Sequence, residues 1–268
     1  MRVSTIQMIS GPDVTLNLIQ AKNLIEQASN NGAELVVLPE YFCLIGNTDQ
    51  EKLAIAETQG SGPIQSFLSE IAKQHKIYLV AGTIPLKGTQ SNKARNSVLV
   101  YNPEGVNICR YDKIHLFKFD NGKEAYDESV VLEPGQNTQS FELESKDGNT
   151  WKIGLSVCYD LRFAELYQQL QADLLLVPAA FTFTTGKAHW ETLLKARAIE
   201  NLAYVVASAQ GGEHPNGRKT FGHSMLINPW GEVLASVELG VTVCTADLDF
   251  AMIQAKRAQL PALEHRVL

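Results

Sequence analysis

Short apolar runs alternate with amphipathic segments along most of the chain, and this alternation is the feature that most restricts its fold. Residues 3–8 and 35–38 have the length and composition of buried strands, and residues 14–30 between them place apolar side chains at helical spacing. The pattern repeats with a helix over about 61–75 and a strand over 77–81. Strands joined by helices in this way are typical of α/β folds.

Two turns of the type Asn-Pro-x-Gly, at 102–105 and 228–231, indicate β-hairpins. We therefore expect antiparallel pairing within otherwise parallel sheets. The apolar runs that flank the turns are 96–101 and 106–111 for the first, and 224–227 and 232–234 for the second. Between the hairpins the alternation resumes with a strand over 152–157, a helix over about 163–171, a strand over 174–177, a helix over about 189–201 and a strand over 204–209.

The two halves of the chain are not divided by a linker rich in Ser or Gly. With 268 residues, of which 45% are hydrophobic, the chain can bury one large core, so a single domain over 1–268 is predicted. One stretch, 117–139, is rich in Asp, Asn, Gly and Pro and loses periodicity. Loops of that length in a compact domain are usually functional or mobile.

The charge balance limits the classes of partner. Lys and Arg total 23 against 29 Asp and Glu, a net charge of −6, which argues against a nucleic-acid partner held through phosphates. There is no apolar run of about 18 residues, the length that a membrane-spanning helix needs, and residues 1–10 do not resemble a targeting segment. We expect a soluble cytoplasmic protein without membrane or nucleic-acid partners.

The four cysteines, Cys43, Cys109, Cys158 and Cys244, are widely spaced and form no Cys-x-x-Cys pair. Such spacing fits free thiols in a reducing compartment rather than a disulfide scaffold or a zinc site. A free cysteine is most often a small buried hydrophobe. A catalytic cysteine can therefore be recognised only from the residues around it.

Three chemically active side chains follow buried strands. Glu40 follows 35–38, Lys113 follows 106–111 and Cys158 follows 153–157. Open α/β sheets bind ligands beyond the carboxyl ends of their strands. A thiol attacks as thiolate and needs a base, which Glu40 could provide, and an ammonium such as Lys113 can stabilise the oxyanion that forms.

The turn after Cys158 adds a second oxyanion donor, because the backbone N–H of Tyr159 lies where a strand meets a helical run. Each of the three residues also has an ordinary role open to it. Glu40 could be a solvated loop residue, Lys113 a surface partner of Asp112, and Cys158 part of the core.

Several segments resemble the nitrilase superfamily of carbon–nitrogen hydrolases, and the resemblance spans almost the whole chain. Three of them are similar to its signature regions in order and spacing: LPE at 38–40, YDKIHL at 111–116 and GLSVCYDLRFAEL at 154–166. Two further stretches resemble the same family: 185–191 continuing into 196–201, and 222–233.

This resemblance implies an α/β fold of the αββα sandwich type, with two mixed sheets packed face to face and helices outside. It also implies that Glu40 is the general base, Lys113 the oxyanion stabiliser and Cys158 the nucleophile of a thioester mechanism. A second glutamate, which orients the lysine and polarises the attacking water, corresponds best to Glu128, with Glu124 as the nearby competitor.

The implied mechanism requires no metal or organic cofactor. The six histidines show no His-x-x-x-His spacing, so the sequence does not nominate a zinc helix.

Within the family, the segments 208–212, 214–219 and 260–266 resemble the deaminated-glutathione amidases. The implied substrate is deaminated glutathione, an anionic 2-oxo amide that is cleaved to 2-oxoglutarate and Cys-Gly. An anionic ligand needs cations, and the candidates are Arg162, Lys187, His189 and Arg218.

Other functions stay open at this point. The nearest is an ω-amidase acting on 2-oxoglutaramate, followed by a non-catalytic binding module, a true nitrilase and a thiol-redox protein. The resemblance also implies a homodimer. Because the sequence ends at Leu268, soon after Arg266, we expect no tail-mediated subunit contacts.

Overall fold

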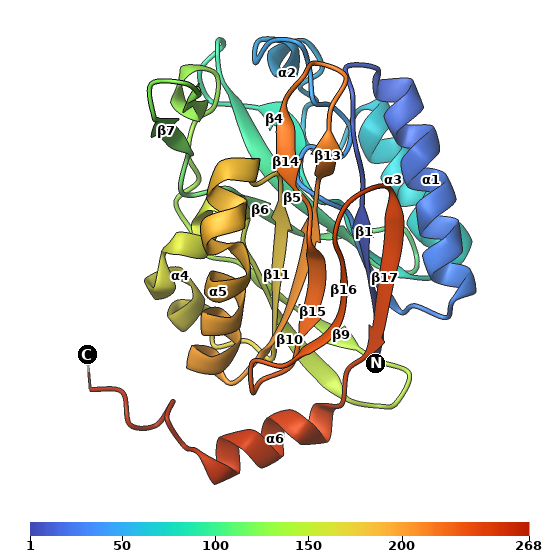
Figure 1. The fold of residues 1–268 in the computed structure, drawn as a ribbon. Coiled ribbons are helices and arrows are strands. Elements are labelled where there is room, and N and C mark those ends of the chain that lie inside the picture. Colours follow the sequence, from blue (N-terminus) through green and yellow to red (C-terminus); the bar gives the residue numbers. More distant parts are fainter. Residues whose placement is uncertain (268) are drawn as a thin grey trace.

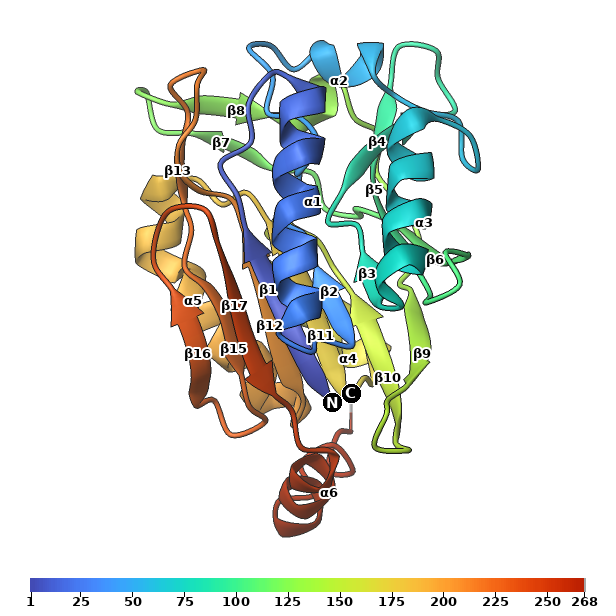
Figure 2. The same ribbon diagram turned by 90° about the vertical axis from the view of Figure 1, so that its right-hand side faces the viewer.

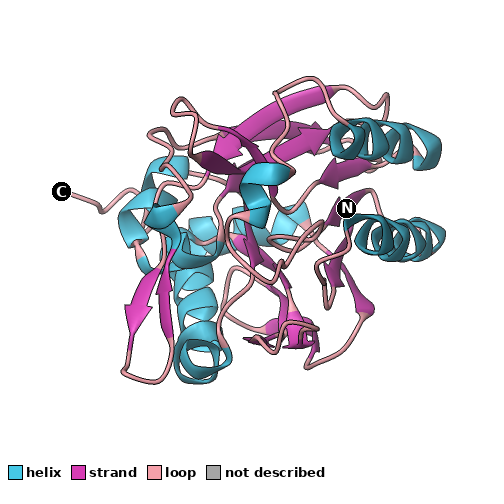
Figure 3. Ribbon diagram, turned by 90° about the horizontal axis from the view of Figure 1, so that it is seen from above, coloured by secondary structure: helices cyan, strands magenta, loops and turns pink. Residues whose placement is uncertain are grey.

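Two β-sheets packed face to face form the centre of the molecule, and helices cover both outer faces (Figure 1). The computed structural model describes residues 1–267. Seen from above, helices flank the strand layers on opposite sides (Figure 3). The αββα sandwich with two mixed sheets is therefore confirmed.

The first sheet has the strand order β17-β1-β2-β3-β5-β4, with β6 paired to β5. Its centre, from β1 to β3, is parallel, and the strands on either side are antiparallel. The strands are β17 (Thr242–Asp247), β1 (Arg2–Gln7), β2 (Leu35–Val37), β3 (Tyr78–Val80), β5 (Ala94–Tyr101), β4 (Ile84–Lys87) and β6 (Asn107–Asp112).

The second sheet has the order β16-β15-β12-β11-β10-β9 and a parallel centre formed by β10, β11 and β12. Its strands are β16 (Val233–Val237), β15 (Ser224–Ile227), β12 (Tyr204–Ala209), β11 (Leu174–Ala179), β10 (Thr150–Leu155) and β9 (Ser140–Glu144). Two small hairpins stand at one end of the sandwich (Figure 2). They are β7 (Lys118–Asp120) with β8 (Ala125–Asp127), and β13 (Gly211–Glu213) with β14 (Lys219–Phe221).

Four helices cover the outer faces. Helices α1 (Val14–Asn30) and α3 (Pro63–His75) lie on the first sheet (Figure 2), and α4 (Ala164–Leu170) and α5 (Phe183–Asn201) lie on the second (Figure 1). Asp13 caps α1 by accepting a hydrogen bond from the Leu16 N–H at 3.1 Å. The short α2 (Glu51–Ala54) lies near the hairpin end, and α6 (Phe250–Gln259) lies at the opposite end.

The main core lies between the sheets. Side chains from both sheets join one buried cluster, such as Val3 and Val37 from the first and Ile153 and Leu155 from the second. Each fully buried side chain of this size contributes about 1.5–3 kcal/mol. A buried polar link crosses the same interface, because the Thr5 hydroxyl donates to the Ala207 carbonyl at 3.0 Å. This packing holds the strand ends of both sheets at fixed positions.

Several elements differ from the sequence predictions. Helix α5 begins at Phe183 rather than near 189, because the Thr182 side chain caps it by accepting from the Thr185 N–H. The stretch 117–139, predicted as a loop, contains the β7–β8 hairpin and the 3₁₀ turn η1 (Glu128–Val130). The two predicted hairpins are present as β5–β6 and β15–β16. Among residues 1–267, no helix is long and apolar enough to cross a membrane.

Candidate active site

A narrow cavity opens at the hairpin end of the sandwich, beyond the carboxyl ends of β2, β10 and β11. Three of the residues predicted to carry the chemistry, Glu40, Glu128 and Cys158, line it. Lys113 lies directly behind Glu40 and Glu128. The full lining consists of Glu40, Phe117, Glu128, Cys158, Tyr159, Ala180, Phe181, Thr182, Thr185 and Arg218.

Cys158 stands on a sharp turn where β10 passes into the 3₁₀ helix η2 (Cys158–Arg162). Its φ of 50° lies in the left-handed region, which costs a residue with a side chain about 1–3 kcal/mol. The surrounding structure must therefore impose this conformation. Cys158 is 7% exposed and borders the cavity.

Glu40 is almost completely buried, and both of its oxygens are occupied. Oε1 accepts hydrogen bonds from Asn96 Nδ2 at 2.8 Å and from Lys113 Nζ at 2.9 Å. Oε2 accepts from the Ala180 N–H at 2.9 Å. The donors come from β5, from the segment after β6 and from the end of β11, so parts of both sheets fix one carboxylate.

The segment that delivers Glu40 runs close to Gly82, which has a φ of 55°. A Cβ at Gly82 would lie 2.0 Å from the Pro39 carbonyl oxygen, so only glycine fits there. The following residue, Tyr41, also has a positive φ of 57°, and its N–H donates to Thr83 Oγ1 at 2.8 Å.

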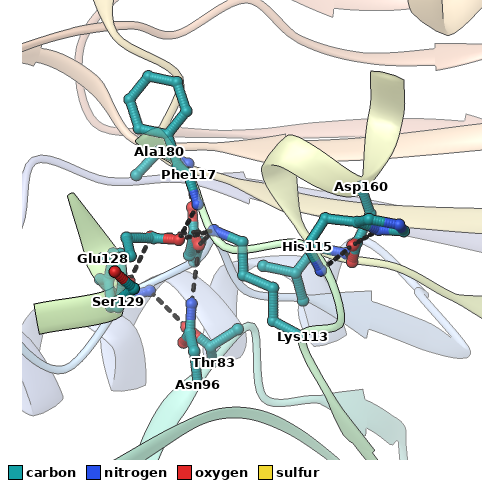
Figure 4. A network of polar contacts seen from close by, with 12 residues as sticks. Thr83, Asn96, Lys113, His115, Phe117, Glu128, Ser129, Asp160 and Ala180 are labelled. Carbon is teal, nitrogen blue, oxygen red and sulfur yellow. Dashed lines mark hydrogen bonds and ion pairs between the residues drawn. The ribbon is translucent and has the colours of Figure 1, made fainter. Parts of the chain in front are cut away.

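Lys113 connects the two glutamates, and Figure 4 shows its side chain beside Glu128. Its Nζ contacts Glu40 Oε1 at 2.9 Å and Glu128 Oε1 and Oε2 at 3.0 and 2.8 Å. Glu128 also accepts from the Phe117 N–H at 2.7 Å and from the Tyr41 hydroxyl at 2.8 Å. Glu124 instead accepts from the Thr184 hydroxyl at 3.0 Å, so the structure brings Glu128, and not Glu124, to the lysine.

These contacts set the charge states. Burial by itself would lower the pKa of Lys113, but the charges of Glu128 and Glu40 raise it above its ordinary value. Burial favours a higher pKa for Glu128, yet the Lys113 ammonium and the hydrogen bonds to the carboxylate lower it. The three groups are therefore one cation between two anions.

The net negative charge of this set acts on the neighbouring thiol. Burial raises the pKa of Cys158 well above its usual value, and the Glu40 carboxylate raises it further, while Lys113 opposes both. At neutral pH, Cys158 is consequently a thiol whose proton must leave during attack.

We expect the rate of Cys158 alkylation by iodoacetamide to keep rising from about pH 7 to about pH 10, because only the thiolate reacts. The rate is measured by mass spectrometry of the peptide that contains Cys158. A plateau below pH 8 would show that the resting protein already holds a thiolate.

The four predicted cations do not lie together. Arg218 lines the cavity, and its guanidinium stacks 4.9 Å above the Tyr126 ring centre. Its Nε is buried without a hydrogen-bond partner among residues 1–267. Lys187 and His189 line a separate groove along α5, and His189 Nδ1 lies 3.2 Å from the Arg162 guanidinium.

Sequence reasoning did not identify several residues of this network. Asn96, Tyr41 and the Ala180 N–H all contact the glutamates directly. Asn96 gave a weak signal, as an amide within the apolar strand β5. Sequence reasoning also missed Asp160, which is fully buried in the turn η2 that begins at Cys158.

The Lys113 ammonium lies between the two glutamates and pairs with both of them. In the part of the chain that the structure describes, no three His, Cys, Asp or Glu side chains are grouped to hold a metal ion.

Comparison with known proteins gives consistent matches over nearly the full length. The family model described as carbon-nitrogen hydrolase matches residues 2–258. The deaminated glutathione amidase of Synechocystis sp. is 42% identical over 98% of this chain and 97% of its own length. The omega-amidase NIT2 of Xenopus tropicalis is 37% identical over 99% and 94% of the two chains.

Among solved structures, the Caenorhabditis elegans NitFhit protein matches with a TM-score of 0.89 and 37% identity. The match covers 99% of this chain, which spans 64% of that longer protein.

Proposed function

The chain belongs to the carbon-nitrogen hydrolase family and is an amidase-type enzyme of it, and from this we propose that it hydrolyses a small anionic 2-oxo acid amide through a thioester on Cys158. The observation that carries the proposal is the cavity in which Cys158 faces the Glu40–Lys113–Glu128 set. Acyl transfer needs a nucleophile, a base and a fixed positive charge, and here Cys158 and Glu40 line the cavity with Lys113 directly behind Glu40.

Acylation begins when Glu40 takes the proton of the Cys158 thiol and Sγ attacks the amide carbonyl carbon. The oxyanion that forms is held by Lys113 Nζ and the Tyr159 N–H. The C–N bond then breaks as Glu40 returns the proton to the departing nitrogen. The products of this step are an amine and a thioester on Cys158.

Deacylation uses the same carboxylate. Glu40 takes a proton from water, and the water oxygen attacks the thioester carbonyl. The C–S bond then breaks as Glu40 returns the proton to Sγ, which releases the acid and restores the Cys158 thiol. Glu128 orients Lys113 and polarises the water. The two charged hydrogen bonds between Glu128 and Lys113 support this role.

The substrate is proposed to be deaminated glutathione, cleaved to 2-oxoglutarate and Cys-Gly. The cavity is narrow, which favours a small acyl group. The 42% identity to the Synechocystis amidase supports deaminated glutathione, and the 37% identity to the Xenopus enzyme supports 2-oxoglutaramate as the second candidate.

The two substrates are separated by kcat/KM measured on both with the same protein. A higher value for deaminated glutathione supports the proposal, and a clear preference for 2-oxoglutaramate would replace it with the ω-amidase reaction. Absence of turnover on either amide would favour a non-catalytic binding module.

Arg218 is proposed to bind the carboxylate of the substrate. Its Nε has no hydrogen-bond partner among the described residues, and its place in the cavity lining also supports this role. Arg162 is a candidate for an outer contact because its guanidinium lies 5.8 Å from the ring centre of Phe181, which lines the cavity. Lys187 and His189 are proposed to contact only substrate groups that extend beyond the cavity.

Replacing Arg218 with methionine is expected to raise KM for the anionic amide about 10- to 100-fold with kcat almost unchanged, because a hydrogen bond to a charged group contributes about 1.5–3 kcal/mol. Steady-state kinetics measures both constants. The matched control is Lys219→Gln. Lys219 is an exposed cation in the same β13–β14 hairpin, and it pairs with Glu213. Equal effects of the two variants would refute a specific role for Arg218.

The proposal extends to assembly and location. We propose one domain over 1–268 that forms a homodimer and works in the cytoplasm. Exposed apolar side chains near the end of α5, including Ile199, Trp230 and Leu260, support pairing, and the four free cysteines support a reducing compartment. Sedimentation equilibrium tests the dimer.

A further inference from the structure

We infer that Asp160 is a positioning residue, which holds the nucleophile turn and the segment that carries Lys113 in a fixed relation. This inference rests on the proposed amidase function and adds a residue to it. Asp160 does not line the cavity and touches none of the reacting groups. It acts through the backbone of the turn and through the neighbours of Lys113.

On one side, Asp160 closes the turn that contains Cys158. The Asp160 N–H donates to the Val157 carbonyl at 3.0 Å, and the Val157 N–H donates back to Asp160 Oδ2 at 2.8 Å. This reciprocal pair spans the residue with the left-handed φ of 50°. The carboxylate therefore helps to impose the unfavourable conformation of Cys158.

On the other side, Asp160 binds the chain on both sides of Lys113. The Tyr111 hydroxyl donates to Oδ2 at 2.7 Å, and the His115 N–H donates to Oδ1 at 3.0 Å. His115 Nδ1 also lies 2.7 Å from Oδ1 (Figure 4). Tyr111 and His115 stand two residues before and after Lys113, so a single carboxylate anchors both flanks of the lysine.

The anchor has no exposure to water. Asp160 and Tyr111 are both fully buried, so the carboxylate depends on the Val157 N–H, the His115 N–H and the Tyr111 hydroxyl as its donors, with His115 Nδ1 beside them. Burial and the Asp160 charge raise the pKa of Tyr111, which keeps its hydroxyl protonated as a donor. The His115 ring adds a second contact between the two segments by stacking on Phe163 at 3.7 Å.

Asp160 affects catalysis through the positions of the two proposed oxyanion donors. Lys113 Nζ and the Tyr159 N–H belong to the two segments that Asp160 joins. Both must meet one oxygen atom, and a misplacement of about 1 Å can cost about 100-fold in rate. Asparagine cannot replace Asp160, because its amide would point N–H groups at existing donors.

The test is Asp160→Asn. We expect kcat to fall about 100-fold with KM changed less than about threefold, because the loss concerns the transition state and not ground-state binding. We also expect slower alkylation of Cys158 by iodoacetamide, a readout that needs no amide turnover. The matched control is Asp173→Asn.

Asp173 lies at the opposite end of β11 and makes the same reciprocal pair with Lys152: its N–H donates to the Lys152 carbonyl at 2.8 Å, and its Oδ2 accepts from the Lys152 N–H at 3.0 Å. The control is expected to lose stability but to keep kcat and the alkylation rate. All rates are compared at a temperature where both variants are folded by circular dichroism.

Wild-type kcat and alkylation in folded Asp160→Asn would overturn the inference, and so would equal losses in Asp173→Asn. If Asp160→Asn does not fold, His115→Phe decides, because phenylalanine keeps the stacking on Phe163 and removes Nδ1. A loss of kcat of about tenfold supports the inference, and an unchanged kcat refutes it. Absence of wild-type turnover would refute the proposed function instead, while the alkylation comparison would still test Asp160.

Discussion

Replacing Cys158 with alanine is expected to lower kcat for the amide by at least about 10⁴-fold, because no other group in the cavity can form the thioester. The fold should survive, since the change removes one buried sulfur atom and alanine is a small buried residue like many in this core. Product release is measured by chromatography, and folding by circular dichroism.

The matched control is Cys109→Ala. Cys109 lies on β6, is only partly buried and has its Sγ 3.9 Å from the Ser140 carbonyl, away from the cavity lining. This variant should keep the wild-type kcat. Unchanged turnover in Cys158→Ala would refute the covalent mechanism and leave only a non-covalent role for the cavity.

Replacing Lys113 with methionine is expected to impair both activity and stability. The variant loses the cation that binds the oxyanion, which should lower kcat about 10³-fold. It also leaves Glu40 and Glu128 buried without their ammonium, at a cost of about 3–5 kcal/mol in the free energy of unfolding. Urea unfolding measures the second effect.

The stability of Lys113→Met is expected to depend on pH in the opposite direction to that of the wild type. In the wild type, the pKa of Glu128 is lowered, so its ionised form adds stability above its ordinary value of 4.5, and this is lost as the pH falls. The raised pKa of Lys113 adds stability that is lost only at strongly alkaline pH, above its ordinary value of 10.5. The set therefore stabilises the protein throughout the neutral range.

Without Lys113, burial of Glu128 is no longer offset by the ammonium and raises the pKa of this carboxyl, so Lys113→Met should become more stable as the pH is lowered from about 8 to about 5. Adding Glu128→Gln to Lys113→Met should recover part of the lost stability, because one unpaired carboxylate is removed. If Lys113→Met were as stable as the wild type at pH 7, the Lys113 ammonium would not be needed to stabilise the two buried glutamates.

The sequence predicted the positions of the main chemical groups because they follow directly from strand ends. Glu40 and Cys158 come after β2 and β10, which are largely buried and pair in parallel with β1 and β11, as the sequence predicted. Lys113 was expected after a buried strand as well, but β6 before it is largely exposed or half-buried and pairs antiparallel with β5. The resemblance to the family added Glu128. The choice between Glu128 and Glu124 needed the structure, because the two residues stand close together around β8 and only the path of that hairpin decides which one faces the lysine.

Other features could not be predicted from local pattern. Asn96, Tyr41 and Asp160 obtain their roles from contacts across 45 or more residues. The strand β17 was not predicted, because Thr242–Asp247 is half-exposed and mixes polar with apolar residues. In the structure it pairs with β1 over six positions. Lys187 and His189 match the family pattern, but the α5 helix carries them to another groove.

The remaining cysteines show that charged neighbours, and not burial, distinguish Cys158 from the structural thiols. Burial alone raises the pKa of Cys244 to about 11, and it is the main reason that the pKa of Cys43 is raised to about 12. Neither lines the cavity or faces a lysine, in agreement with the core role predicted for them. Cys158 is equally buried but has Glu40 and Lys113 beside it.

Intact-mass spectrometry of the protein, stopped by acid during the first turnovers of deaminated glutathione, tests the central claim most directly. The account predicts a fraction of protein heavier by one 2-oxoglutaryl group, with the added mass on the peptide that contains Cys158 and absent from Cys158→Ala. An acyl group on a different residue, or amide hydrolysis at the wild-type rate by Cys158→Ala, would contradict it.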